Sequence, residues 1–132
     1  MTARRRNQTG STSLELVVLF PVLLAVIFGL VQGALWFHAR NVAAAAAQEG
    51  VRVARVETGT AEAGRARAAG FLADAGGADV LTDPTIDVTT DAQRVRVVVA
   101  GRSISVLPGV PGLAVEQSAA GPVERFTTRT GP

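Results

Sequence analysis

A long apolar run lies near the amino terminus of the chain. From Leu16 to Phe37 it contains 22 residues, and Gln32 is the only strongly polar one among them. A helix of this length measures about 33 Å, which is enough to cross the hydrocarbon core of a bilayer. Trp36 and Phe37 lie at its far end, where aromatic rings favour the headgroup region. Pro21 predicts a kink or a softened first part of the helix.

The helical pattern continues beyond the apolar run. Residues 41–56 are rich in alanine and carry a polar face. An apolar face is predicted from the helical spacing of Val42, Ala45, Ala46, Val53 and Val56. Together the two parts predict one rod of about 45 residues and 65–70 Å. Residues 58–60 should end this rod, and a second helix is expected over 61–75, with Thr60 as its N-cap and Gly76-Gly77 after its end.

Beyond Pro84 the period changes from helical to alternating. Strands are predicted around Ile86 and Val88, over 94–99, over 103–106 and over 113–119. Residues 90–93 suit a hairpin connection, Gly101-Arg102 a turn or bulge, and 107–112 a loop.

These elements predict an α+β fold. It consists of a long N-terminal transmembrane helix that continues into an extracytoplasmic helix, a second short helix, and a small antiparallel sheet. The expected segments are a basic leader (1–10), a transmembrane and assembly helix (11–38), an extracytoplasmic helical region (39–77), the sheet (84–126) and a flexible tail (127–132).

Charge is concentrated at the amino terminus. Arg4, Arg5 and Arg6 supply three of the 13 basic residues, and after Gly10 the chain carries 10 arginines against 11 acids. The basic character therefore belongs largely to the leader, and no nucleic acid partner is expected. A positive flank predicts a cytoplasmic amino terminus and an extracytoplasmic remainder. The chain has no cysteine, which excludes disulfides and thiolate metal sites.

One acid sits at the head of the apolar run. Glu15 follows Gly10 by five residues, and a carboxylate at a membrane span is costly enough to need a reason. A cut between Gly10 and Ser11 would leave a new α-amine about one helical turn from Glu15. In a packed assembly Glu15 could then pair with the Ser11 amine of a neighbouring subunit.

Two other interpretations of this region stay open. The first is an uncleaved single-span anchor whose Glu15 reaches the headgroups and whose outer domain binds a partner. The second is a secretory signal peptide cut in the alanine-rich stretch near Ala47. Against the second, the apolar run is far longer than the usual 7–15 residues or so.

The leader, Gly10, Glu15 and the apolar helix resemble the type IV prepilin class. Within that class the chain is similar to the TadE-like minor pilins, or pseudopilins, of the tight-adherence (Flp) pilus. The residues that carry the resemblance are Gly10, 14–16, 21–24, Gly29, 32–33, 41–45 and 48–54, with a looser likeness around Glu124.

This resemblance implies a function in pilus assembly. It implies cleavage after Gly10 by a prepilin peptidase, a tight-adherence (Flp) pilus as the setting, and a role for Glu15 in assembly. It also implies contacts with other pilins or pseudopilins, the pilus assembly platform and membrane lipid. The expected location is the cell membrane, single-pass, or the pilus after processing.

The remaining polar residues are more typical of structural or solvent-exposed positions than of a functional site. His38 fits an interfacial side chain better than a catalytic centre, Glu49 and Arg52 fit an i, i+3 pair, and Arg94 and Arg96 fit a solvated sheet face. The aspartates after residue 73 do not have the spacing of a calcium loop. No enzyme activity, cofactor or metal is expected.

Overall fold

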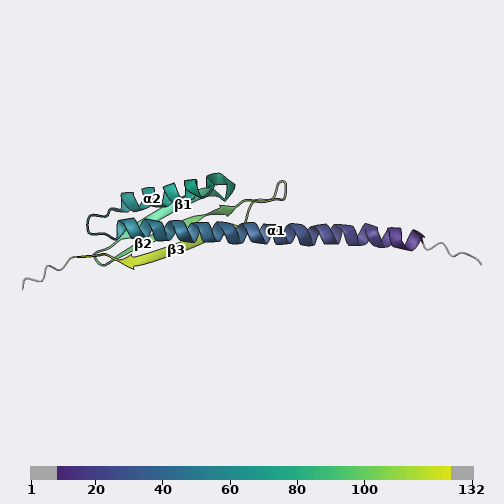
Figure 1. Cartoon of the computed structure of the whole chain (residues 1–132), viewed down its shortest axis with the longest axis horizontal. Helices are drawn as coiled ribbons and strands as arrows, with labels where there is room; N and C mark the ends of the chain where they lie inside the picture. Colours follow the sequence, from purple (N-terminus) through teal and green to yellow (C-terminus); the bar gives the residue numbers. More distant parts are fainter. Residues whose placement is uncertain (1–8, 126–132) are drawn as a thin grey trace, which may run out of the picture.

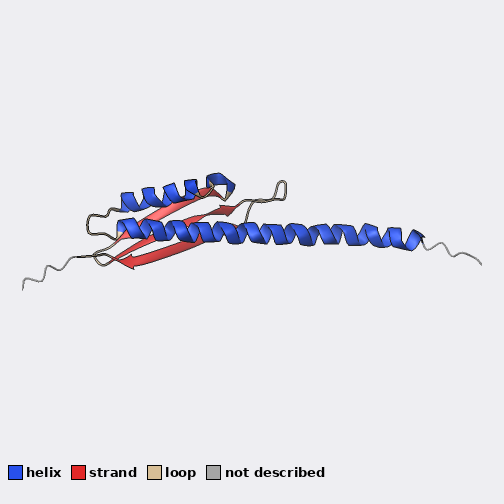
Figure 2. Ribbon diagram, viewed as in Figure 1, coloured by secondary structure: helices blue, strands red, loops and turns tan. Residues whose placement is uncertain are grey.

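A computed structural model describes residues 9–125, which form two α-helices, one short 3-10 helix and three strands. In chain order these are α1 (Thr9–Ala54), α2 (Ala61–Asp74), η1 (Gly77–Asp79), β1 (Leu81–Thr90), β2 (Arg94–Ser103) and β3 (Ala114–Pro122). The predicted α+β architecture is confirmed (Figures 1 and 2). Most of the expected leader and all of the expected tail lie outside the described residues.

The predicted rod is one helix of 46 residues, about 69 Å long. It passes without interruption through Pro21 and through the expected boundary at residue 38. Proline removes one backbone donor, but the turns on either side keep their own hydrogen bonds. Only the C-terminal half of α1 lies against the rest of the fold, and the N-terminal half projects beyond it (Figure 1).

Small residues form the face of α1 that packs. Its buried positions are Ala39, Ala43, Ala46, Ala47, Gly50, Val51 and Ala54. The predicted apolar face is therefore rotated from the real one. Only Ala46 of that set is buried, while Val56 is 39% exposed. Alanine on several sides of a helix gives the periodicity little contrast, so the packing partners decide which side is buried.

The second helix is held close to the first. Thr60 caps α2 as predicted, because its hydroxyl accepts a hydrogen bond from the Ala63 amide at 3.0 Å. Gly50 of α1 and Gly64 of α2 face each other, and a Cβ atom on Gly64 would lie 2.9 Å from the Gly50 carbonyl oxygen. The two backbones can approach this closely only because neither residue carries a side chain.

The sheet is antiparallel, in the order β1-β2-β3. β1 begins at Leu81, three residues before the expected start of the sheet, and its register shifts between Thr82 and Thr85. The irregularity surrounds Pro84, which cannot donate to a ladder and is tolerated on an edge strand.

The strand predicted over 103–106 is wrong. β2 runs unbroken from Arg94 to Ser103, and Gly101-Arg102 lies within it rather than at a turn. A Cβ atom on Gly101 would lie 2.8 Å from Leu81 Cγ, so this glycine makes room for the neighbouring strand. The third strand, expected over 113–119, is observed as β3.

The two faces of the sheet differ. Val95, Val97 and Val99 of β2 and Val115 of β3 are buried under the helices. α1 contacts β2 and β3, and α2 contacts β1. The opposite face carries Arg94 and Arg96, both exposed, and the predicted solvated face is thus confirmed. The second half of α1 is packed within this helix-on-sheet unit, and the first half extends beyond it.

Candidate functional site

The N-terminal half of α1, residues 13–31, is apolar and packs against no other element of the described structure. We call this segment the apolar rod. All residues from Ser13 to Val31 are exposed, including Leu14 at 72%, Leu30 at 70% and Leu16 at 67%. The helix is long and apolar enough to cross a membrane, and no part of its most apolar 18-residue window is buried. A helix in the core of a soluble protein would be covered, so the chain has the character of a single-pass membrane protein.

The residues of the expected cleavage and assembly site lie at the tip of this rod. Gly10 and Ser11 belong to the first turn of α1, and Glu15 follows within the same helix. Ser11 and Glu15 occupy positions i and i+4 along the helix. Glu15 is exposed among apolar neighbours. The three residues therefore lie on one short stretch of α1, as their spacing in the sequence requires.

Polar contacts mark the point where the helix-on-sheet unit begins. The Gln32 amide nitrogen donates to the Ile104 carbonyl oxygen at 3.0 Å, and its amide oxygen accepts from the Val106 N–H at 3.2 Å. One turn later the Trp36 indole nitrogen donates to the Ala114 carbonyl oxygen at 3.0 Å. The sequence analysis gave Gln32 as an interruption of the apolar run and as part of the family resemblance, and it assigned no contact to this residue. A lone amide in such a run was nevertheless a signal that it has a partner.

Two ion pairs join the C-terminal end of α1 to other segments of the chain. The Glu49 carboxylate accepts hydrogen bonds from Arg67 of α2 at 2.9 and 3.0 Å, besides the expected pair with Arg52 at 3.6 Å. Arg55 pairs with Glu124 at 3.2 Å, and the Glu124 N–H donates to the Arg55 carbonyl oxygen at 2.8 Å. The partners Arg67 and Glu124 were not foreseen, because both pairs join segments far apart in sequence.

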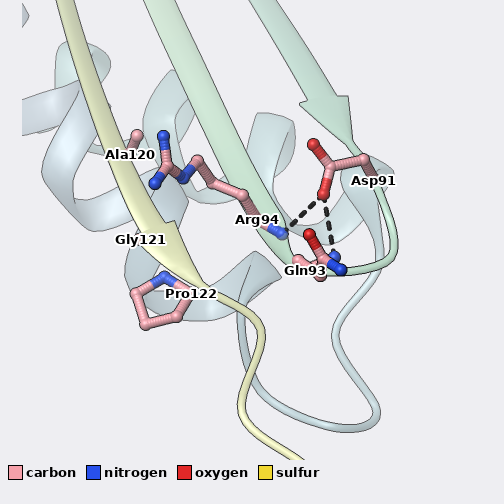
Figure 3. A pocket seen from close by; sticks show the side chains of 6 residues that line it. All are labelled: Asp91, Gln93, Arg94, Ala120, Gly121 and Pro122. Atoms are coloured by element: carbon pink, nitrogen blue, oxygen red, sulfur yellow. Dashed lines mark hydrogen bonds between the residues drawn. The ribbon is translucent and has the colours of Figure 1, made fainter.

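A pocket of about 710 Å³ lies at the opposite end of the sheet from Gln32, beside the β1–β2 turn (Figure 3). Asp91 lines it and accepts hydrogen bonds from the Gln93 and Arg94 amides at 2.8 and 2.7 Å. These bonds, with help from the Arg94 charge, lower the pKa of the Asp91 carboxyl below its usual value. The Asp91 carboxylate therefore stabilises the β1–β2 turn. The six residues that line the pocket include no nucleophile paired with a base.

His38 is exposed on α1, just beyond Phe37. Its position next to Trp36 and Phe37 agrees with the interfacial interpretation. The neighbouring Arg40 guanidinium lies 5.4 Å from the centre of the Trp36 ring, which places a cation and an aromatic ring together at this level of the helix.

Comparison with known proteins identifies the N-terminal part. Residues 10–52 match the family described as TadE-like protein, which is about a third of the chain and covers most of α1. No curated protein and no solved structure matches the chain. The matched segment begins at Gly10 and contains Glu15, the apolar rod and the Glu49-Gly50-x-Arg52 pattern.

Proposed function

We propose that this chain is a minor pilin precursor, and the match of residues 10–52 to the TadE-like family, which is associated with the Tad pilus, supports the proposal. It is cleaved between Gly10 and Ser11 by a prepilin peptidase and takes part in assembling a tight-adherence pilus. The leader stays on the cytoplasmic side, and the helix-on-sheet unit faces outward.

One observation carries this proposal. The exposed rod holds a single carboxylate, Glu15, four residues from the amine that cleavage would create. A lone acid in hydrocarbon is costly, and an opposite charge from a neighbouring subunit would offset that cost. The exposed side chains around Glu15 are the surface on which other pilins or pseudopilins would pack after α1 has left the lipid bilayer.

The position of the proposed cut, in the first turn of α1, supports the proposal. The first turn of an α-helix has N–H groups without intrahelical partners, so the bond after Gly10 opens more easily than one further along α1. By contrast, a cut near Ala47 would remove Ala39, Ala43 and Ala46 from the core. The fold therefore disfavours the secretory-signal interpretation.

The direct test is the mature amino terminus, measured by intact mass and terminal sequencing of protein from its native membrane. A start at Ser11 supports the proposal. A full-length chain supports instead the uncleaved membrane-anchored interaction protein, and a start near Ala47 indicates a secretory signal.

Gly10→Val should block maturation, because a branched side chain prevents close approach of the peptidase to the backbone. Gly70→Val is the matched control, since a Cβ atom there meets nothing within 4 Å and the site lies on α2. Mature-sized product from the Gly10 variant would refute the cut.

Glu15→Gln tests the carboxylate separately from the cut. It keeps the side-chain size and removes the charge that would pair with the Ser11 amine. We expect processing to continue and piliation to fall. Normal piliation would remove the assembly role of Glu15.

A further inference from the structure

The connection between β2 and β3 is an uncharged and largely apolar loop. We call residues 104–113 the apolar loop; they include no acidic or basic side chain. Leu107, Val110 and Leu113 are 38%, 50% and 51% exposed. Three large apolar side chains on one short loop are an unusual surface for contact with water alone.

The loop is held against α1 at a defined height. Ile104 and Val106 bond to Gln32, and Ala114, the residue after the loop, bonds to Trp36. Beyond these contacts the tip extends past the end of the sheet in the direction of the apolar half of α1, and it stands apart from the helix ribbon (Figure 1). The loop therefore points along the rod rather than away from it.

The tip is also prepared for an apolar environment. Residues 107–110 form a turn closed by a hydrogen bond from the Val110 N–H to the Leu107 carbonyl oxygen at 3.2 Å, and Gly109 has φ +74°. This is the geometry that a Pro-Gly pair favours. The Leu107 amide donates to Ser105 and the Leu113 amide donates to Ser103, while Pro108 and Pro111 have no N–H group. Few backbone donors would lose water on burial.

The position of the apolar loop along the axis of α1 matches the edge of a bilayer's hydrocarbon core. The exposed apolar part of α1, residues 14–31, is about 27 Å long as a helix, close to the thickness of a hydrocarbon core. Gln32 follows immediately, so the apolar loop lies where the core ends. Arg102, at the stem of the loop, donates to the Gly112 carbonyl oxygen at 3.1 Å. The Arg40 guanidinium lies 5.4 Å from the centre of the Trp36 ring, whose indole nitrogen donates to Ala114. Cations at this level suit the headgroup region.

We propose that the apolar loop is a second membrane contact, which inserts Leu107 and Val110 into the headgroup–acyl boundary of the leaflet on the sheet's side. The proposal rests on α1 spanning that membrane. With contacts at both α1 and the loop, the helix-on-sheet unit would sit in a fixed orientation on the lipid surface instead of rotating about α1.

The absence of cysteine from the sequence permits a direct test with single labels. In the full-length protein in phosphatidylcholine–phosphatidylglycerol vesicles, Val110→Cys carries an environment-sensitive fluorophore. Val22→Cys, in the middle of the exposed rod, reports on the span itself, and Gln93→Cys, at the opposite end of the sheet, reports on water. Each label is exposed to a quencher in water and to spin-labelled lipids.

We expect the label at position 110 to emit at shorter wavelength than the label at 93, to resist the aqueous quencher, and to be quenched by lipids labelled near the headgroup. Quenching at 22 but not at 110 would overturn the loop contact and leave the span intact. No lipid quenching at 22 would instead refute the span on which the proposal rests. Protection of position 110 that grows with protein density, without lipid quenching, would assign the loop to a protein partner and also overturn the proposal.

Discussion

At the scale of single residues, Glu49 shows how one side chain acquires a second role from the fold. It lies on α1 and pairs with Arg52 of the same helix, yet its shorter contacts go to Arg67 of α2. The Glu49 side chain is only 24% exposed, so this ion pair is less screened by solvent than a pair on an open helix face.

A double-mutant cycle with Glu49→Gln and Arg67→Gln should give a coupling free energy towards the upper end of about 0.2–1 kcal/mol. The matched control is Glu62 with Arg65, whose side chains are 81% and 44% exposed and which should couple more weakly. Thermal unfolding in detergent measures both cycles. Equal coupling in the two pairs would mean that the contact between α1 and α2 adds nothing beyond an exposed helix pair.

At the scale of elements, the crossing of α1 and α2 depends on Gly50 and Gly64. A Cβ atom on Gly64 would lie 2.7 Å from Ala54 Cβ, a distance that real Cβ atoms do not adopt. Further along α2, Gly70 is exposed and a Cβ atom there meets nothing within 4 Å. The same helix thus holds one glycine that packing requires and one that it does not.

Gly64→Ala should destabilise the fold by about 1–3 kcal/mol, because the helices must separate to admit the methyl group. Gly70→Ala should stabilise it by about 0.5–1 kcal/mol, since alanine is the better helix former. Opposite shifts in melting temperature, followed by circular dichroism, would support the close crossing. A stabilising effect of Gly64→Ala would contradict it.

At the scale of the whole molecule, α1 belongs to two environments. Its first half is exposed and apolar, and its second half carries core alanines beneath the sheet. The passage from one to the other falls near Gln32 and Trp36, whose side chains bond to the β2–β3 connection. The described fold therefore includes the last part of the segment expected to span the membrane.

Two fragments separate these environments. A fragment of residues 31–125 keeps Gln32, Trp36 and the buried Ala39, whereas one of residues 40–125 loses all three. Both should dissolve without detergent, because the exposed rod is gone. The shorter fragment should be less stable by about 1–3 kcal/mol from its lost hydrogen bonds alone. Equal melting temperatures would show that these contacts are dispensable.

Local sequence pattern was sufficient to predict the long helix, the cap at Thr60, the alternating strands, the apolar rod and the position of Glu15 within it. These features depend on local pattern: the length of an apolar run, a hydroxyl before a helix, or alternation along a strand. Each can be recognised without knowing what lies opposite in space.

Contacts between segments, in contrast, determine which side of α1 is buried, where β2 ends, and which partners Gln32, Glu49 and Arg55 bind. The physical reason is that these outcomes depend on pairs of segments. An alanine-rich helix can bury any of several sides, and the arriving sheet selects one. The local sequence around Gly101 is typical of a turn. In the fold, Gly101 lies against Leu81 of β1 and is part of a strand.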